Sequence, residues 1–324
     1  MKAPRIVVVG SYATGLTMKV DRLPGTGETV LGTGYRVDYG GKGSNQAVGC
    51  ARLGASVSFV AKIGKDSFGE MALTLYREER IETSHVVQMP EAPTGVGFII
   101  VEKDSGHNCI TIDPGANELL SASDVSAGVP AGDRPAVVIT QLEIPVAAAA
   151  AAMANGRACG AITILNPAPV RPLPASVLET VDVLTPNETE ARVLAGIPPH
   201  TPMEPEQVAR ELIRGKAKQV VMTLGEKGAL VVTASSATHI AAIAASAVDT
   251  TGAGDAFNAG LAMALASGTN LEEAVRFAVI IGGLAVTKEG VIPSLPQVAD
   301  VLSFYRQQGQ TAPTWLQESG SKVS

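Results

Sequence analysis

The stretch Asp249–Gly260, DTTGAGDAFNAG, places a carboxylate beside two glycines at a point where a helix is expected to begin. Gly252 and Gly254 allow backbone N–H groups to converge, and the positive end of a helix adds to them. Such a nest can stabilise a phosphoryl group during transfer while Asp255 accepts a hydroxyl proton. The alternative is a plain helix N-cap at Asp255. The stretch by itself leaves both interpretations open.

Other polar and glycine residues follow the expected strands. These positions are Asn166, Asn187, Gly225 and the loop that begins at Asp249. In open parallel sheets, ligands bind beyond the carboxyl ends of the strands. The residues of interest therefore fall at the edge of the sheet where a ligand is expected.

Continuous apolar runs predict the strands that must position this site. The runs are Arg5–Gly10, Ser56–Gly64, Ala136–Thr140, Ala161–Asn166, Val181–Asn187 and Gln219–Gly225. Helical patterns such as Asn45–Leu53 and Pro205–Gly215 separate them. Apolar strands alternating with helices are typical of a parallel sheet that is covered on both faces.

Two segments and the C-terminus depart from this pattern. Met18–Gly40 and Thr94–Asp113 read as antiparallel hairpin material and predict a small accessory sheet. From about Gln307 onward the sequence is polar and lacks periodicity, so we expect residues 307–324 to be a mobile tail after a single domain of residues 1–306.

The composition excludes several classes of protein. The chain has 324 residues, 46% hydrophobic and 17% charged, with a net charge of −6, so neither nucleic acid nor an anionic membrane is an expected partner. No apolar run approaches the ~18 residues of a membrane span, and the N-terminal MKAPRIVVVG reads as a buried strand rather than a signal peptide. The 3 widely spaced cysteines fit a reducing cytoplasm better than a disulfide or metal site.

Two familiar nucleotide-binding motifs are missing. There is no G-x-x-x-x-G-K-[ST] sequence, and the loop after the first strand, GSYATG, lacks the G-x-G-x-x-G spacing. The sequence therefore argues against a P-loop enzyme and against a dinucleotide-dependent dehydrogenase.

Six motifs occur in a fixed order along the chain. They are GGKGSNQAVGCARLGA (Gly40–Ala55), QLE (Gln141–Glu143), NPAP (Asn166–Pro169), TPNETE (Thr185–Glu190), TLGEKG (Thr223–Gly228) and the Asp249–Gly260 stretch. In this order they resemble the ribokinase branch of the PfkB carbohydrate kinase family, over roughly residues 5–305. The resemblance implies a three-layer α/β sandwich with a mainly parallel central sheet and a small antiparallel β lid, formed by segments of about residues 12–44 and 93–113.

The resemblance also implies roles for residues at the catalytic centre. Asp255 would be the base for the terminal hydroxyl of a sugar, and Gly252, Ala253 and Gly254 would form the anion hole. The residues implied in sugar binding are Gly41, Lys42, Gly43, Asn45, Glu143 and Asp255. Without the resemblance, the glycine-rich segment reads equally well as a simple β-to-α turn, and Glu143 as a solvated loop acid.

ATP, Mg²⁺ and a monovalent cation, usually K⁺, are the cofactors that the resemblance implies. The nucleotide would contact Asn187, Thr223, Gly225, Gly228 and Gly254. Asn187 and Glu190 would lie near Mg²⁺, mostly through water, although the same residues also read as an ordinary helix start. The monovalent cation would be held by the Asp249 side chain, the carbonyls of Thr251, Ala285, Lys288 and Gly290, and the hydroxyl of Ser294.

The sequence departs from the ribokinase pattern after the first strand. The pattern reads Gly-Ser-x-Asn-x-Asp, with the Asn and Asp on the secondary hydroxyls of the sugar, whereas this chain has Ala13 and Gly15 at those positions. Loss of a charged hydrogen bond of this kind costs about 1.5–3 kcal/mol of binding. D-ribose itself is thus in doubt, and a bulkier or differently configured sugar, a sugar acid or a polyol could fit. A second departure, Val279, suggests an apolar wall against adenine.

The leading hypothesis is an ATP-dependent carbohydrate kinase that phosphorylates a primary hydroxyl of ribose or a related sugar. The alternatives are a nucleoside kinase with the same fold and a non-catalytic regulator that binds sugar or nucleotide. Apolar runs in the expected lid, Gly95–Val101 and Thr29–Val37, would leave exposed strand edges in a monomer. We therefore expect a homodimer that forms through the lid.

Overall fold

A computed structural model of the chain describes residues 3–320. A nine-stranded sheet forms its centre, and the strand order across it is β13-β12-β11-β10-β9-β8-β1-β4-β5. The strands are β1 (Arg5–Val9), β4 (Ser56–Gly64), β5 (Glu82–Met89), β8 (Val137–Thr140), β9 (Ile162–Leu165), β10 (Val183–Leu184), β11 (Val220–Thr223), β12 (Ala229–Val232) and β13 (Ala237–Ile240). From β5 to β11 every neighbouring pair is parallel, and only β12 and β13 are antiparallel to their neighbours.

Helices cover both faces of this sheet. Consecutive residues of a strand point to opposite faces, so each strand contributes apolar side chains to both layers of helices. In β1, Ile6 and Val8 belong to one apolar cluster, while Val7 and Val9 belong to the other. The first cluster is shared with α1 (Lys42–Arg52), α2 (Ser67–Glu78), α8 (Ala253–Ala266), α9 (Leu271–Ala285), α10 (Val291–Ser294), α11 (Val298–Gln307) and α12 (Thr314–Gly320). The second is shared with α3 (Ala122–Gly128), α4 (Val146–Ala158), α5 (Ala175–Leu178), α6 (Glu188–Leu194) and α7 (Pro205–Arg214). The three-layer sandwich predicted from the sequence is confirmed.

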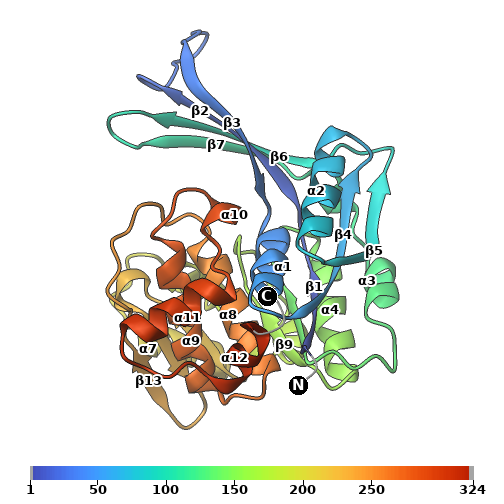
Figure 1. Cartoon of the computed structure of the whole chain (residues 1–324), viewed down its shortest axis with the longest axis vertical. Helices are drawn as coiled ribbons and strands as arrows, with labels where there is room; N and C mark the ends of the chain where they lie inside the picture. The colour runs from blue at the N-terminus through green and yellow to red at the C-terminus, as the bar shows by residue number, and fades with distance from the viewer. Residues whose placement is uncertain (1–2, 321–324) are drawn as a thin grey trace.

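A second sheet projects from one end of this body (Figure 1). It has the order β3-β2-β6-β7 and consists of β2 (Ala13–Val20), β3 (Gly32–Gly40), β6 (Gly95–Glu102) and β7 (Asn108–Asp113). Both outer pairs are antiparallel, and the central pair β2–β6 is parallel. We call this second sheet the lid. Two short 3₁₀ helices, η1 (Gly115–Leu119) and η2 (Gly225–Lys227), complete the described elements.

The C-terminal segment differs from the expectation of a mobile polar tail. Helix α12 and the residues just before it pack on the body. Leu316 is fully buried and Ala312 is nearly so, and the centroids of the Trp315 and Phe277 rings lie 4.9 Å apart in an edge-on arrangement. Three apolar side chains among polar neighbours give no visible periodicity, yet they are enough to anchor a short helix. Residues 321–324 of the expected tail lie outside the described residues. Among the residues that the structure describes, no helix is long and apolar enough to cross a bilayer.

Candidate active site

Helix α8 begins at the glycine turn singled out in the sequence. Gly252 is its N-cap with φ 78°, and a Cβ at this position would lie 2.6 Å from Cγ1 of Val291. Both the backbone angle and the close neighbour therefore require glycine. The first-turn N–H groups of a helix have no intrahelical acceptors, so the Gly254 N–H is available to an anion. The Ala253 N–H makes a long hydrogen bond of 3.3 Å to the Thr250 carbonyl.

Asp255 lies in the first turn of α8 and is only 5% exposed. Its two carboxylate oxygens accept hydrogen bonds from Asn45 Nδ2 at 2.8 Å and Gln46 Nε2 at 3.0 Å. Gln46 also donates to Asn166 at 3.1 Å and accepts from Gln141 at 2.5 Å. We call these five side chains the Asp255 network. The network holds the carboxylate rigidly, which a simple helix cap would not require.

Two oxygens of the network, Gln141 Oε1 and Asn45 Oδ1, are buried and have no hydrogen-bond partner among the described residues. Asn45 Oδ1 is the one that lies next to Asp255, because Nδ2 of the same amide donates to that carboxylate. An unpaired buried acceptor is costly, because its desolvation is not compensated. A hydroxyl donor next to Asp255 would satisfy it.

Glu143, which follows β8, is tied to the glycine turn before α1. Its Oε2 accepts from the Ser11 hydroxyl at 2.6 Å and from the backbone N–H of Lys42 at 2.8 Å. A Cβ on Gly43 would lie 2.4 Å from the backbone nitrogen of Ser11, so only glycine allows the turn to approach β1 this closely. The predicted residues Gly41, Lys42, Gly43, Asn45 and Glu143 are thus brought together beside Asp255.

The Lys42 side chain stands among acidic groups. Burial opposes the charge on its ammonium, but Asp255, Glu143 and Glu190 outweigh burial and raise the pKa of Lys42. Lys42 therefore stays a cation within reach of the carboxylates, where it can offset negative charge.

Asn187 and Glu190 lie at the N-terminus of α6, where the sequence could be interpreted either as an ordinary helix start or as a site near Mg²⁺. Asn187 Oδ1 accepts from the Glu190 N–H at 2.8 Å, and Glu190 Oε2 accepts from the Asn187 N–H at 2.9 Å. This capping box uses one oxygen of each side chain. Burial raises the pKa of Glu190, and the same carboxyl interacts electrostatically with Lys42 and Asp255, so it also faces the site. The helix-start interpretation is confirmed, and the position of the Glu190 carboxyl is compatible with a second role in the site.

A cavity of about 530 Å³ opens on the other side of the α8 start. Its walls include Thr223, Gly225, Gly228 and Gly254, four of the five residues expected to contact a nucleotide. The fifth, Asn187, joins Thr223 through a parallel backbone bridge. Val279 forms part of the wall, as the expected apolar contact requires.

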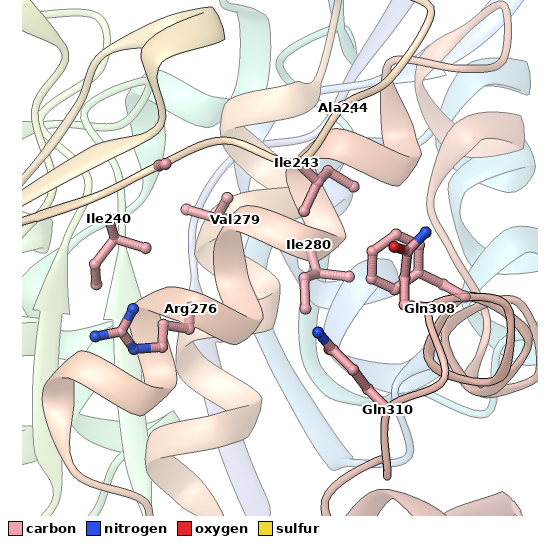
Figure 2. Close-up of a pocket in the computed structure, with 10 residues that line it drawn as sticks. Ile240, Ile243, Ala244, Arg276, Val279, Ile280, Gln308 and Gln310 are labelled. Atoms are coloured by element: carbon pink, nitrogen blue, oxygen red, sulfur yellow. The ribbon is translucent and has the colours of Figure 1, made fainter.

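A second cavity of about 360 Å³ adjoins the first (Figure 2). The two share Ile243, Ala244 and Val279 in their linings. Figure 2 shows the guanidinium of Arg276 on one side and Gln310 on the other. Apart from Val279, none of the residues singled out in the sequence lines this cavity.

The loop expected to hold a monovalent cation is closed around Asp249. The Asp249 carboxylate accepts from the N–H groups of Thr251 at 2.9 Å and Gly290 at 3.0 Å. Burial by itself would raise the pKa of Asp249, but these N–H groups and nearby Arg36 lower it, so the carboxylate is ionised at neutral pH. The Ser294 hydroxyl is buried and donates to the Val291 carbonyl at 2.8 Å.

The Asp249 carboxylate and the Ser294 hydroxyl are hard oxygen donors, the type that hard cations prefer. The Ala285 carbonyl, which was also predicted as a ligand, accepts from the Lys288 N–H at 3.4 Å. Across the described residues, no three histidine, cysteine, aspartate or glutamate side chains converge as a metal-binding group. Residues 3–320 therefore contain no metal site built from these side chains alone.

Sequence reasoning missed three groups that the fold brings to the site. Gln46 bridges Asp255 and Asn166, Ser11 supports Glu143, and Asn258 donates to the Gly254 carbonyl at 2.8 Å while accepting from Thr185 at 2.7 Å. Gln46 and Asn258 lie inside the two long motifs. Their amide side chains, next to residues already chosen, were the available signal.

The fold and this site together are those of a small-molecule phosphotransferase: a parallel α/β sandwich with an anion-binding helix start, a buried carboxylate and an adjoining cavity. The sequence profile of the pfkB family carbohydrate kinases matches residues 3–298. A ribokinase of Haemophilus influenzae is 35% identical over 299 residues, which cover 92% of this chain and 97% of the relative. A deoxyribokinase of Salmonella typhi is 34% identical over 294 residues, covering 90% and 96%.

A solved structure agrees with these sequence matches. Arabidopsis thaliana ribokinase, complexed with ribose and ATP, superposes with a TM-score of 0.83 at 32% identity, covering 93% of this chain and 98% of that one. The chain belongs to the pfkB family of carbohydrate kinases, within its ribokinase branch. It is an ATP-dependent sugar kinase.

Proposed function

We propose that the protein transfers the γ-phosphoryl group of ATP to a primary hydroxyl of ribose or a closely related sugar, with Asp255 as the base. The observation that carries the proposal is the position of this buried carboxylate, held by Asn45 and Gln46 at the start of α8. A base in phosphoryl transfer has mainly to orient the hydroxyl and take its proton late. A rigid carboxylate beside an anion-binding helix start meets that need.

The sugar would lie against the glycine turn and the Asp255 network. The unpaired Asn45 Oδ1 would accept from one hydroxyl, and Glu143 Oε1, the oxygen not engaged by Ser11 and Lys42, would accept from another. The N–H groups at Gly252, Ala253 and Gly254 would stabilise the charge that develops on the phosphoryl group. Lys42, kept protonated by its acidic neighbours, would add a positive charge at the same place.

ATP would occupy the 530 Å³ cavity, with Thr223, Gly225, Gly228 and Gly254 at its walls and Asn187 beside them. Bound Mg²⁺ would neutralise charge on the ATP phosphates. Asn187 and Glu190 would approach it mainly through water, since each has one side-chain oxygen engaged in the capping box. A monovalent cation such as K⁺ would bind at Asp249, Ser294 and the carbonyls of Thr251, Ala285, Lys288 and Gly290, and would fix the shape of the loop behind the anion hole.

We also propose a homodimer formed through the lid. Apolar side chains are exposed on its strands and loops: Leu31, Tyr35, Phe98, Ile110 and Ile112 are between 52% and 91% exposed. Strand β7 is exposed along its whole length and pairs on one side only. A second lid would cover both the apolar surface and the open edge. The proposed compartment is the cytoplasm, in keeping with three free cysteines.

The test is ATP consumption with Mg²⁺ and K⁺ across pentoses, hexoses, polyols, sugar acids and nucleosides, with Asp255→Asn as the inactive control. Turnover on a sugar that disappears in Asp255→Asn supports the proposal, and turnover on nucleosides alone makes the protein a nucleoside kinase. ATP binding without turnover on any compound would favour the regulator.

A further inference from the structure

The register between the strands of the lid shows which residues share the face that lies over the site. One row across the sheet is Asp38, Gly15, Gly97 and Ile112, from β3, β2, β6 and β7 in that order. The row further from the body is Arg36, Thr17, Ile99 and Ile110. Residues that are paired across strands share one face of a sheet, so Asp38 and Gly15 lie on the same face as Arg36.

This face is turned toward the catalytic side of the body. Arg36 reaches Glu289, in the loop between α9 and α10, at 2.7 Å (Figure 1 shows β3 running down beside α10). On the opposite face, the residues nearest the body pack against it. The Thr14 hydroxyl lies 3.2 Å from the Tyr12 hydroxyl, and Tyr39 contacts the apolar core. We call the face of Asp38, Gly15 and Arg36 the inner face. Strand β3 then runs into the glycine turn before α1, and Lys42 and Asn45 lie in the first turn of that helix.

The inner face has a bare patch at Gly15 and Gly97. A Cβ on Gly97 would have no neighbour within 4 Å, and one on Gly15 would meet nothing closer than 3.7 Å. Neither glycine is among the residues with positive φ. Backbone geometry and packing therefore do not require glycine here, and the patch is open space over the turn that leads to Asn45.

Asp38 borders this open space and supplies a carboxylate. A Cβ on Gly15 would lie 3.9 Å from the Asp38 Cβ, so the two positions are direct neighbours. Arg36 Nε lies 3.4 Å from Asp38 Oδ2, but the same guanidinium also pairs with Glu289. Arg36 also interacts electrostatically with Asp249, so three carboxylates surround one cation and the local charge is net negative. Such a border accepts hydrogen bonds from hydroxyls and repels a carboxylate or phosphate on the ligand.

We propose that Asp38 is a specificity-determining residue, which binds a secondary hydroxyl of a neutral sugar or polyol lying over the patch of Gly15 and Gly97. This carboxylate from β3 would take the place of the one that the ribokinase pattern carries at position 15 on β2. The bare patch would leave room for a substituent that an aspartate at position 15 would exclude. Asp38 is not among the site residues that the sequence resemblance implies, and this inference rests on the proposed sugar kinase activity.

The experiment moves the carboxylate between strands. With the best neutral sugar of the panel, Asp38→Asn should raise the KM for sugar about 10–100-fold and leave the KM for ATP unchanged, because one charged hydrogen bond is lost. Gly15→Asp alone should also bind sugar poorly, because two neighbouring carboxylates repel each other. The double variant Gly15→Asp with Asp38→Asn should recover at least tenfold of the loss, and its preference should move toward smaller sugars.

Two controls separate this role from a structural one. Arg36→Ala removes the partner of Asp38, so an equal rise in the KM for sugar would mean that Asp38 acts only by holding Arg36, and the inference would be wrong. Asp38→Asn with an unchanged KM for sugar, or a wild-type preference for sugar acids, would overturn it as well.

Failure of the proposed function gives a different result. If the wild type phosphorylates no compound, calorimetric titration of the sugars into the wild type and Asp38→Asn still tests the contact without turnover. Weaker binding by Asp38→Asn would then support the contact although the kinase proposal had failed, and equal binding would refute it.

Discussion

The Asp255 network and the lid lie at the same end of the sheet, yet their side chains are held in opposite ways. The five side chains of the network are joined by hydrogen bonds of 2.5–3.1 Å, and Asp255 is 5% exposed. The lid exposes isoleucine, phenylalanine and leucine side chains, and its polar contacts to the body are few and partly exposed. Buried polar groups that are joined by several hydrogen bonds fix one geometry, whereas an exposed sheet can vary without unfolding the protein.

This difference suggests a division of tasks. The proposed catalytic base lies where side chains are held by buried hydrogen bonds. The proposed recognition of a particular sugar and the proposed contact with a second chain fall on the lid, where substitutions cost little stability. The departures from the ribokinase pattern at Ala13 and Gly15 both fall on the lid strand β2 and none falls in the network, as this division expects.

The largest effect should come from removing the charge at the centre of the network. Asp255→Asn should lower kcat by about 10²–10⁴-fold while the KM for ATP changes little, because the base is lost and the nucleotide cavity is not. A coupled assay of ADP release measures this. The control Asp21→Asn changes an exposed lid carboxylate and should leave kcat unaltered. If Asp255→Asn keeps more than a tenth of kcat, another group is the base.

Assembly should respond to the lid and not to the body. Ile110 on β7 and Val193 on α6 are similarly exposed, at 52% and 47%. Sedimentation at micromolar concentration should give a dimer for the wild type and for Val193→Asp, and a monomer for Ile110→Asp, because a buried unpaired charge opposes association. A monomeric wild type would remove the lid dimer from the proposal.

Two glycines of the site differ in the room that they leave for a side chain, and alanine substitutions should show this difference. A Cβ at Gly43 would lie 2.4 Å from the Ser11 nitrogen and 2.6 Å from the Gly10 carbonyl carbon, whereas one at Gly254 would have no neighbour within 4 Å. Gly43→Ala should therefore lower the free energy of unfolding by about 1–3 kcal/mol. Gly254→Ala should leave it equal or raise it by up to ~1 kcal/mol, since alanine favours the helix. Urea unfolding compares them, and equal losses would contradict the tight turn.

The smallest effect concerns the base of the lid. Asp66 caps α2 through the Gly69 N–H at 2.8 Å and also accepts from the Thr94 N–H at 2.8 Å and the Thr94 hydroxyl at 2.7 Å. Burial would raise the pKa of Asp66, but these donors outweigh it and lower the pKa below its unfolded value of about 3.9. The resulting stability is present above that pH and is lost as the pH falls through the folded pKa.

Asp66→Asn keeps a cap but removes the charge. It should lower the free energy of unfolding at pH 7 by up to ~1 kcal/mol, and the difference from wild type should shrink as the pH falls below about 4. Urea midpoints at pH 7 and pH 3 measure it. A difference that is the same at both pH values would mean that the charge of Asp66 does not stabilise the lid base.

Much of the body could be predicted from local pattern. All six apolar runs became β1, β4, β8, β9, β10 and β11, because a strand buried on both faces needs a continuous apolar sequence. The short helix α12 was not predicted, since three apolar residues in a polar stretch are a weak signal until Phe277 and the core are present to receive them.

The chain order of the motifs was enough to indicate the family and the residues to examine, because glycine turns, the helix start at Gly252 and the residue types at strand ends are local properties of the sequence. What joins Asp255 to Gln46, 209 residues away, or Asp38 to Gly15 on the neighbouring strand, is not local. Sheet order and strand register decide those contacts, and both depend on packing between segments that the sequence keeps apart. The tertiary structure alone therefore decided that Asp255 is held by two amides and that a carboxylate from β3 borders the bare patch.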